Sequence, residues 1–239
     1  MLEVTSGPGR ARSRTGAART ARGLTLVELM IGIAIGLVIA AAAISFLATS
    51  LHEQRRLLLE SRLMQDLRTA ADIVARDLRR AGYWGAAADS VRQFDTGSAP
   101  ANPYLAIAPS SAASDSVAFL YSRDANENGV VDANERFGFR LRAGILEMQL
   151  GAGNWQALTD PGTLSVGTFS IEPSVQDVTL EQGCQSACPS ASIDCPPRVS
   201  VRSLAVLLTG NAVADPSLSR TVRSLIRLRN DAVTGACPA

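Results

Sequence analysis

The segment Arg22-Gly23-Leu24-Thr25-Leu26-Val27-Glu28-Leu29-Met30-Ile31 leads into a run of 23 residues without charge, Leu29–Leu51. At a rise of about 1.5 Å per residue, a helix of this run is about 34 Å long. The hydrocarbon core of a bilayer is about 30 Å thick, so the run predicts a transmembrane helix. A cleaved secretory signal has a shorter apolar core, although residues 40–43 are small, like those found at its cleavage site.

The 239-residue chain has a net charge of +1, but its charges are unevenly distributed. Residues 1–23 hold five Arg and one acid, whereas the other 216 residues hold 18 Arg and 21 acids. A basic head before an apolar run is typical of a targeting segment. It places the N-terminus in the cytoplasm and the chain beyond Leu51 outside. The small net charge argues against a chain that coats nucleic acid, and we expect no nucleic-acid partner.

The composition weakens most enzyme classes. All 23 basic residues are Arg, so a lysine nucleophile, a Schiff base and a P-loop lysine are excluded. His52 is the single histidine, which leaves little room for a Ser-His or Cys-His pair or a multi-His zinc site. No nucleophile–base pair or phosphate loop is visible. We therefore expect that the protein is not an enzyme.

Glu28 lies inside the apolar segment that begins at Leu24. A charged side chain at the centre of a bilayer costs about 2.5–3.5 kcal/mol on insertion scales, and less near the edge. Either this carboxylate reaches the lipid headgroups, or it has a specific partner. Glu28 is therefore a candidate functional residue.

Residues 22–31 resemble the processing signal of type IV prepilins and related pseudopilins. In that family a basic leader ends in Gly, and Glu is the fifth residue of the mature chain. The resemblance implies that leader 1–23 is cleaved between Gly23 and Leu24 and that the new N-terminus is methylated. It also implies an assembly role for Glu28, whose carboxylate an amine of a neighbouring subunit would neutralise inside an apolar filament core.

The helical pattern continues beyond the membrane segment. Apolar residues recur at helical spacing on one face: Leu59, Leu63, Leu67, Ala70, Val74, Leu78 and Ala81. Gly82 is a stop signal. The sequence predicts one helix with a transmembrane half, residues 24–51, and an amphipathic half, residues 52–81. The closing stretch, residues 79–85, resembles the end of the long helix in PilW-type minor pilins.

Residues 82–239 are predicted to form a periplasmic β domain. Residues 86–114, rich in Ala, Ser, Pro, Gly and Asn, indicate a long surface loop with little regular structure. Ala143-Gly144 predicts a hairpin turn. The expected fold class is α+β and pilin-like, with a long N-terminal helix packed on an antiparallel β-sheet. The predicted strands are Ser116–Ser122, Arg136–Arg142, Ile145–Leu150, Phe169–Val175, Val199–Thr209 and Thr221–Arg229.

An acidic stretch between two predicted strands, residues 124–135, matches the spacing of a twelve-residue EF-hand calcium loop. Gly129 stands where that loop turns sharply. The flanking segments are predicted strands, so the usual pair of helices is missing. The alternative is a polar hairpin loop shaped by Asp, Asn and Gly turn chemistry. We expect structural Ca²⁺, bound with millimolar-type affinity by Asp124, Asn126, Asn128, the Val130 carbonyl, Asp132 and Glu135.

Four cysteines lie beyond the membrane segment: Cys184, Cys188, Cys195 and Cys237. Their spacing fits no common zinc pattern well, although a metal site made of all four is an alternative. An oxidising periplasm favours two disulfides, for which three pairings are possible. We expect one of the clustered cysteines to pair with Cys237 and the other two to close a small loop. Residues 182–198 would then be a stapled surface loop.

The resemblance implies a PilW-type minor pilin, made as a single-pass inner-membrane precursor and then built into a type IV pilus. Its role would be assembly or initiation, with adhesion at the tip. Its partners would be major and minor pilins, the prepilin peptidase/methyltransferase and the inner-membrane assembly platform. A J-type pseudopilin of a type II secretion system would have nearly the same signal and fold. A third alternative is a membrane-anchored, calcium-dependent binding protein that never enters a filament.

Overall fold

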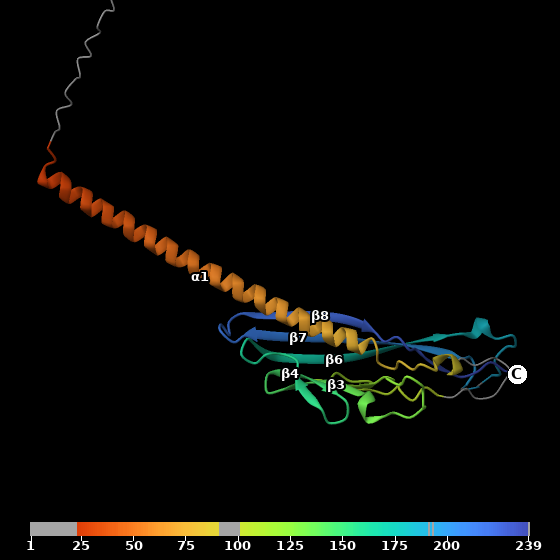
Figure 1. The fold of residues 1–239 in the computed structure, drawn as a ribbon. Helices are drawn as coiled ribbons and strands as arrows, with labels where there is room; N and C mark the ends of the chain where they lie inside the picture. The colour runs from red at the N-terminus through yellow and green to blue at the C-terminus, as the bar shows by residue number, and fades with distance from the viewer. Residues whose placement is uncertain (1–22, 91–100, 191, 193, 239) are drawn as a thin grey trace, which may run out of the picture. The chain divides into compact units, whose positions relative to one another are not determined.

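The computed structural model describes residues 23–90, 101–190, 192 and 194–238 (Figure 1). The chain divides into two units, Met1–Glu53 and Gln54–Ala239. Helix α1, Leu26–Leu78, begins in the first unit and ends in the second. Most of the predicted leader, residues 1–22, lies outside the described residues.

The C-terminal part of α1 buries one face against the rest of its unit. The buried residues recur at helical spacing: Leu63, Leu67, Ala70, Ala71, Val74, Ala75 and Leu78. This confirms the predicted amphipathic half, except that Leu59 is only partly buried. The helix ends at Leu78, slightly before the expected Ala81, and the chain turns at Gly82, where φ is +77°. The Gly82 amide donates to the Leu120 carbonyl at 2.8 Å.

The first sheet has five antiparallel strands in chain order: β1 (Ile107–Ala108), β2 (Ser116–Leu120), β3 (Arg136–Arg142), β4 (Ile145–Leu150) and β5 (Trp155–Ala157). The predicted hairpin between β3 and β4 is confirmed, because Arg142 pairs with Ile145. In its turn, Ala143 and Gly144 have φ of +49° and +78°. Positive φ at both positions gives a type I′ turn, whose twist matches that of the flanking strands.

The second sheet contains β6 (Leu164–Thr179), β7 (Arg198–Ala212), β8 (Ser219–Arg227) and β9 (Ala232–Thr234). β7 pairs along its length with β6, and on its other edge with β8 and β9. All six predicted strands are present. The structure differs from the prediction in three ways. β6 is much longer than the predicted strand Phe169–Val175, and the short strands β1, β5 and β9 were not predicted. The strands also form two sheets rather than one. The distal end of β6 is exposed on both faces, so its sequence carries no alternating pattern.

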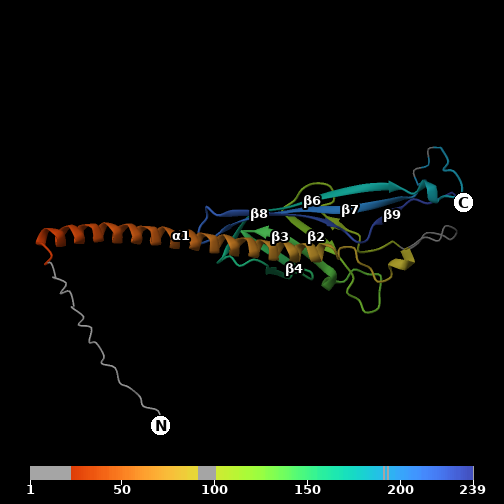
Figure 2. The same cartoon turned by 90° about the horizontal axis from the view of Figure 1, so that it is seen from above.

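The core lies between the C-terminal part of α1 and the two sheets (Figures 1 and 2). It contains Phe119 and Phe139 of the first sheet and Leu208 of the second, all 2% exposed or less. α1 passes very close to β7 at Gly210. A Cβ atom built there would lie 3.2 Å from Leu67 Cδ2 and only 2.5 Å from Leu164 Cδ1, so only glycine fits without a shift.

The segment predicted as a surface loop, residues 86–114, is more ordered than expected. It contains a 3-10 turn, η1 (Ala87–Ser90), and strand β1, and the side chain of Tyr104 is completely buried. Tyr104 belongs to no periodic pattern of apolar residues, so the sequence did not reveal that it is buried. Residues 91–100 of this segment lie outside the described residues.

Candidate functional site

Gly23 and Leu24, which flank the predicted cleavage site, precede the first turn of α1. Both residues are exposed and lie outside regular secondary structure, and Leu24 exposes 77% of its surface. Exposed, irregular backbone is the conformation that proteases cleave most readily. The bond between Gly23 and Leu24 therefore lies in exposed, irregular backbone.

Thr25 and Glu28 form a reciprocal capping box at the start of α1. The Glu28 amide donates to Thr25 Oγ1 (3.2 Å), and the Thr25 amide donates to Glu28 Oε2 (3.3 Å). The Thr25 hydroxyl also donates to the same carboxylate oxygen (3.2 Å). Side chains thus satisfy two backbone amides that the helix leaves unpaired. Thr25 was not among the predicted site residues, although Thr-x-x-Glu before an apolar run is the signature of such a box.

The N-terminal half of α1 presents apolar side chains on every side. Residues 26–49 are all exposed, with Leu29, Ile35 and Phe46 exposing 54%, 55% and 77% of their surfaces. By length and composition, α1 is the one helix of the described chain that could cross a membrane. A helix that is apolar all round is stable only in lipid or among other helices. This half therefore has the properties of a membrane anchor.

Residues 124–135 are organised around the buried carboxylate of Glu135. Its Oε1 accepts a hydrogen bond from the Arg123 amide (2.8 Å). Its Oε2 accepts one from the Asp132 amide (2.8 Å) and one from the Tyr104 hydroxyl (3.0 Å). Glu135 ends the 3-10 turn η2 (Ala133–Glu135) and is completely buried. Both carboxylate oxygens are therefore engaged by donors of the protein itself.

Glu135 and Tyr104 titrate away from their ordinary ranges. Burial alone would raise the pKa of Glu135, but the hydrogen bonds from Arg123, Asp132 and Tyr104 outweigh it, and the pKa lies below its ordinary 4.5. Burial, together with the hydrogen bond to Glu135, raises the pKa of Tyr104 from 10.0 to about 12. At neutral pH the pair is therefore a neutral phenol that donates to a carboxylate.

Glu127 also turns towards the protein rather than towards the centre of the loop. Its Oε1 accepts hydrogen bonds from the Ser122 hydroxyl (2.7 Å) and the Gly85 amide (2.5 Å). Gly85 follows Trp84, which is 6% exposed, in the turn after α1. Glu127 therefore ties the acidic loop to the end of the long helix. Its role was not predicted, because the calcium pattern assigns no function to this position.

Asp124, Asn128 and Asp132 take part in hydrogen bonds within the loop. Asp124 Oδ2 accepts a hydrogen bond from the backbone N–H of Asn128 (3.3 Å), and the Asn128 side chain donates from Nδ2 to Asp132 Oδ2 (3.2 Å). The Val130 amide donates to Asn128 Oδ1 (2.6 Å). Gly129 has a φ of +72°, so it makes the sharp turn that its position predicts. The structure thus brings Asp124, Asn128 and Asp132 together.

The predicted calcium ligands fit a cation only in part. Asn126 is exposed on the loop, and the Val130 carbonyl lies 3.3 Å from the Tyr104 hydroxyl, whose one hydrogen it shares with Glu135. Within the described part of the chain, the carboxylates of Asp124, Asp132 and Glu135 do not gather within 4.8 Å of one another. Glu135 could contribute both oxygens to Ca²⁺ only by giving up a donor at Oε2, which already accepts two hydrogen bonds. Calcium binding stays a prediction.

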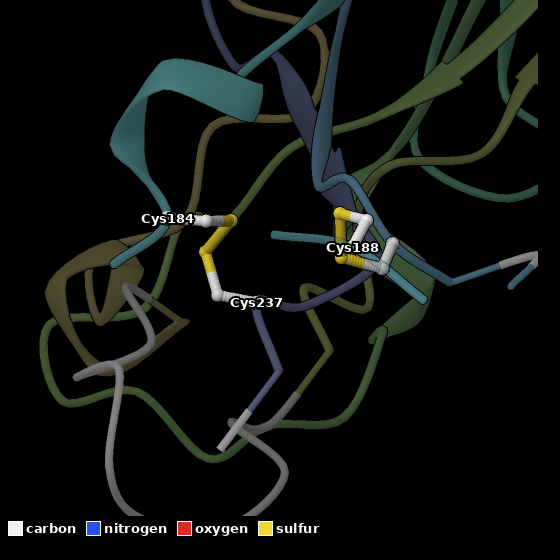
Figure 3. Close-up of a disulfide and its surroundings, with 4 residues drawn as sticks. Cys184, Cys188 and Cys237 are labelled. Carbon is white, nitrogen blue, oxygen red and sulfur yellow. A yellow bond between two sulfur atoms is a disulfide. The ribbon is translucent and has the colours of Figure 1, made fainter. Parts of the chain in front are cut away.

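The four cysteines form two disulfides, Cys184–Cys237 and Cys188–Cys195 (Figure 3). This is the predicted pattern: one clustered cysteine pairs with Cys237, and the other two close a short loop. No cysteine is left free, so the alternative of a metal site with four thiolates is not present in this structure. The Ala236 amide also donates to the Asp194 carbonyl (2.7 Å), so the C-terminal tail is fixed to the stapled loop.

Arg202 joins segments that are far apart in the sequence and was not predicted. Its Nη1 donates to the Leu105 carbonyl (2.7 Å) and its Nη2 to the Asn230 carbonyl (2.8 Å). Asn230 and Asn102 in turn donate from their side-chain amides to the Gly82 carbonyl at the end of α1. Burial lowers the pKa of Arg202. Its partners lie 97 and 28 residues away, so no local pattern marks it.

Two known families match this chain. Residues 18–44 match the prokaryotic N-terminal methylation motif, and residues 56–228 match prepilin peptidase-dependent protein B. No curated protein and no solved structure matches. The first match covers the predicted cleavage site, Glu28 and the start of α1, and the second covers the amphipathic part of α1 and the strands from β1 to β8.

These matches confirm the prepilin-like character that the N-terminal motif predicts, and they indicate a structural, pilin-like protein. The second match extends over well more than half of the sequence. The chain therefore belongs to the prepilin peptidase-dependent protein B family.

Proposed function

We propose that this protein is a PilW-type minor type IV pilin that acts in pilus assembly or initiation and in contacts at the pilus tip. The leader, residues 1–23, is removed, the amine of Leu24 is methylated, and the subunit polymerises through α1. It begins as a single-pass inner-membrane precursor with its C-terminal domain in the periplasm and ends in the filament at the cell surface. Its partners are major and minor pilins, the prepilin peptidase/methyltransferase and the assembly platform.

The observation that carries this proposal is the position of Glu28 relative to Gly23. Cleavage after Gly23 creates a free amine at Leu24, which is charged near neutral pH. This amine then lies four residues before the carboxylate, at the start of a helix that is apolar on all sides. Among the described residues Glu28 has no ion-pair partner, and only Thr25 donates side-chain or amide hydrogen bonds to its carboxylate. An amine from a neighbouring chain supplies the missing countercharge.

The first test is the mass of the N-terminal peptide of the chain isolated from membranes. We expect a methylated peptide that begins at Leu24 when the prepilin peptidase is active, and an uncleaved chain when the peptidase gene is deleted. A chain that still begins near Met1 in cells with active peptidase would contradict the proposal.

The second test separates filament subunits from a plain membrane anchor. Glu28→Ala should abolish incorporation into filaments, whereas Glu53→Ala, which removes an exposed acid of the same helix, should leave incorporation intact. If Glu28→Ala also leaves it intact, the membrane-anchored binding protein is favoured. Deleting the gene then distinguishes the pilus from the secretion system: loss of pili supports the minor pilin, and loss of protein secretion supports the J-type pseudopilin.

Calcium binding by residues 124–135 is a separate proposal about the same protein. The ligand pattern and the proximity of Asp124, Asn128 and Asp132 support it. The hydrogen bonds of Glu135 favour instead a polar loop that the protein holds without a metal. A calcium-dependent melting temperature decides between the two.

A further inference from the structure

The second sheet has an outer face, on the side away from its buried residues. On β7, Leu204, Val206 and Leu208 are buried, while the alternate residues Ala205 and Leu207 are half-buried. Antiparallel partners lie on the same face, so the strand register extends this outer face to β6 and β8. We define the outer face by Val199, Val201, Ala205 and Leu207 on β7, Glu172 on β6 and Leu225 on β8.

Apolar residues follow β7 along the outer face and are interrupted only at Ser203; we call them the apolar strip. Val178, Val199 and Val233 lie side by side on β6, β7 and β9, and Val178 and Val233 expose 44% and 61% of their surfaces. Further along β7, Ala205 lies beside Leu225, which exposes 74%. Isolated exposed apolar residues are common, but an ordered row across three strands marks an interaction surface.

The two edges of the outer face carry opposite charges. Glu172, Ala205 and Leu225 form one row across the sheet. Arg223 and Arg227 lie two residues to either side of Leu225 and therefore share its face. Arg227 pairs with Asp231 (2.8 Å), but in the described residues Glu172 and Arg223 have no ion-pair partner. The outer face thus carries one carboxylate on β6 and two guanidinium groups on β8.

We infer that the outer face is an interface with a second copy of this chain, packed face to face about a two-fold axis parallel to β7. This axis lays β7 on β7, so that the apolar strips meet, and lays β6 of each copy on β8 of the other. Glu172 then faces Leu225 of the second copy, between that copy's Arg223 and Arg227. The alternative axis, perpendicular to the strands, lays β8 on β8 and opposes Arg to Arg. Charge complementarity selects the first arrangement.

The available area fits a weak dimer. Three strands at a spacing of about 4.8 Å, and the length of β7 at about 3.3 Å per residue, give an area of about 700 Å² per copy. Specific interfaces bury about 800 Å² per partner, so this one lies just below the standard size. The contact uses only residues of the unit Gln54–Ala239 and does not depend on N-terminal cleavage.

Cysteine cross-linking of the full chain, purified from membranes in detergent, tests the interface. All four native cysteines are paired, so Ala205→Cys introduces the only free thiol of the chain. A short bismaleimide should yield a product of twice the monomer mass, at least about fivefold more than with Thr69→Cys, an exposed control on α1. Equal yields from the two variants would overturn the inference, as would a cross-link to a protein of different mass.

A charge swap tests the predicted arrangement of the two copies. In the Ala205→Cys background, Glu172→Arg places like charges opposite each other and should lower the dimer yield about tenfold. Adding Arg223→Glu should restore the yield. Unchanged melting temperatures will show that the variants are folded. A yield that Glu172→Arg leaves unchanged, or that the double variant fails to restore, would overturn the inference. Neither result affects the cleavage and filament tests of the proposed function.

Discussion

The two halves of α1 share one secondary structure but have contrasting environments. In the first half, Phe46 and Leu47 expose 77% and 58% of their surfaces, whereas in the second half Leu67 and Leu78 expose none. Helix propensity does not separate the halves, since both are rich in Leu and Ala. The difference lies in what covers the side chains. The second half is covered by sheets of its own chain, and the first half needs lipid or helices of other molecules.

The largest expected effect contrasts equivalent substitutions in the two halves. Leu67→Ala empties a fully buried position of the core, and we expect it to lower the free energy of unfolding by about 2–5 kcal/mol. Leu47→Ala removes the same atoms from a position with no cover in its own chain, and we expect a change below about 0.5 kcal/mol. Denaturant unfolding of the Gln54–Ala239 unit in detergent-solubilised protein measures both. If both variants lower the free energy of unfolding by similar amounts, the two halves of α1 do not differ in how their own chain covers them.

Glu135→Gln tests how much the buried carboxylate of Glu135 stabilises the loop of residues 124–135. The amide cannot accept all three hydrogen bonds, so one donor is left unpaired, and we expect a loss of about 2–3 kcal/mol. The depressed pKa of Glu135 means that its stabilisation is present above pH 4.5 and is lost as the pH falls below it. The variant should therefore lose less stability in acid than the native chain. Melting curves between pH 3 and pH 7 check this difference.

Tyr104 makes the stability of the fold depend on pH in the alkaline range. Its pKa is raised from 10.0 to about 12, so the neutral phenol stabilises the fold fully below pH 10. This contribution is lost as the pH rises from 10 towards 12. Tyr104→Phe keeps the ring in the core but removes the hydroxyl, and we expect a loss of about 1 kcal/mol at neutral pH. If the variant's melting temperature falls as steeply above pH 10 as that of the native chain, Tyr104 is not the responsible group.

Gly210→Ala tests the close approach of α1 to the second sheet. The added methyl group would collide with Leu164 and press on Leu67, and we expect a loss of about 1–3 kcal/mol from overpacking. Gly183→Ala is a matched control, because nothing lies within 4 Å of a Cβ at that position. Thermal melting should separate the two variants, and equal melting temperatures would show that the helix can move away from β7 at no cost.

The last prediction concerns calcium. At a concentration ten times the dissociation constant, a ligand adds about 1.4 kcal/mol to stability. If the loop binds Ca²⁺, millimolar calcium should raise the melting temperature of the native chain but not that of Asp124→Ala. If the hydrogen bonds of Glu135 hold the loop by themselves, calcium changes neither, and Asp124→Ala alone has little effect.

Local chemistry was the part that could be predicted from the sequence. The apolar N-terminal half of α1, its amphipathic second half, the turn at Gly82 and the type I′ hairpin at Ala143-Gly144 each depend on neighbours within a few residues. The contacts of Tyr104 and Arg202 could not be predicted, because their partners lie 26 to 97 residues away. The sequence identified Glu135 as a candidate ligand, but the groups that donate hydrogen bonds to its carboxylate are visible only in the folded structure.

By itself, the sequence determined the cleavage motif, the helix that follows it and the disulfide-forming set of cysteines, because these depend on residue type and spacing along the chain. The tertiary structure decided that the strands divide into two sheets, that Cys184 is the partner of Cys237, and that Glu135 faces inward. It also decided which apolar residues of the second sheet remain uncovered. Each of these depends on which distant segments meet, and the free energy of such contacts is a property of the packed chain rather than of any local pattern.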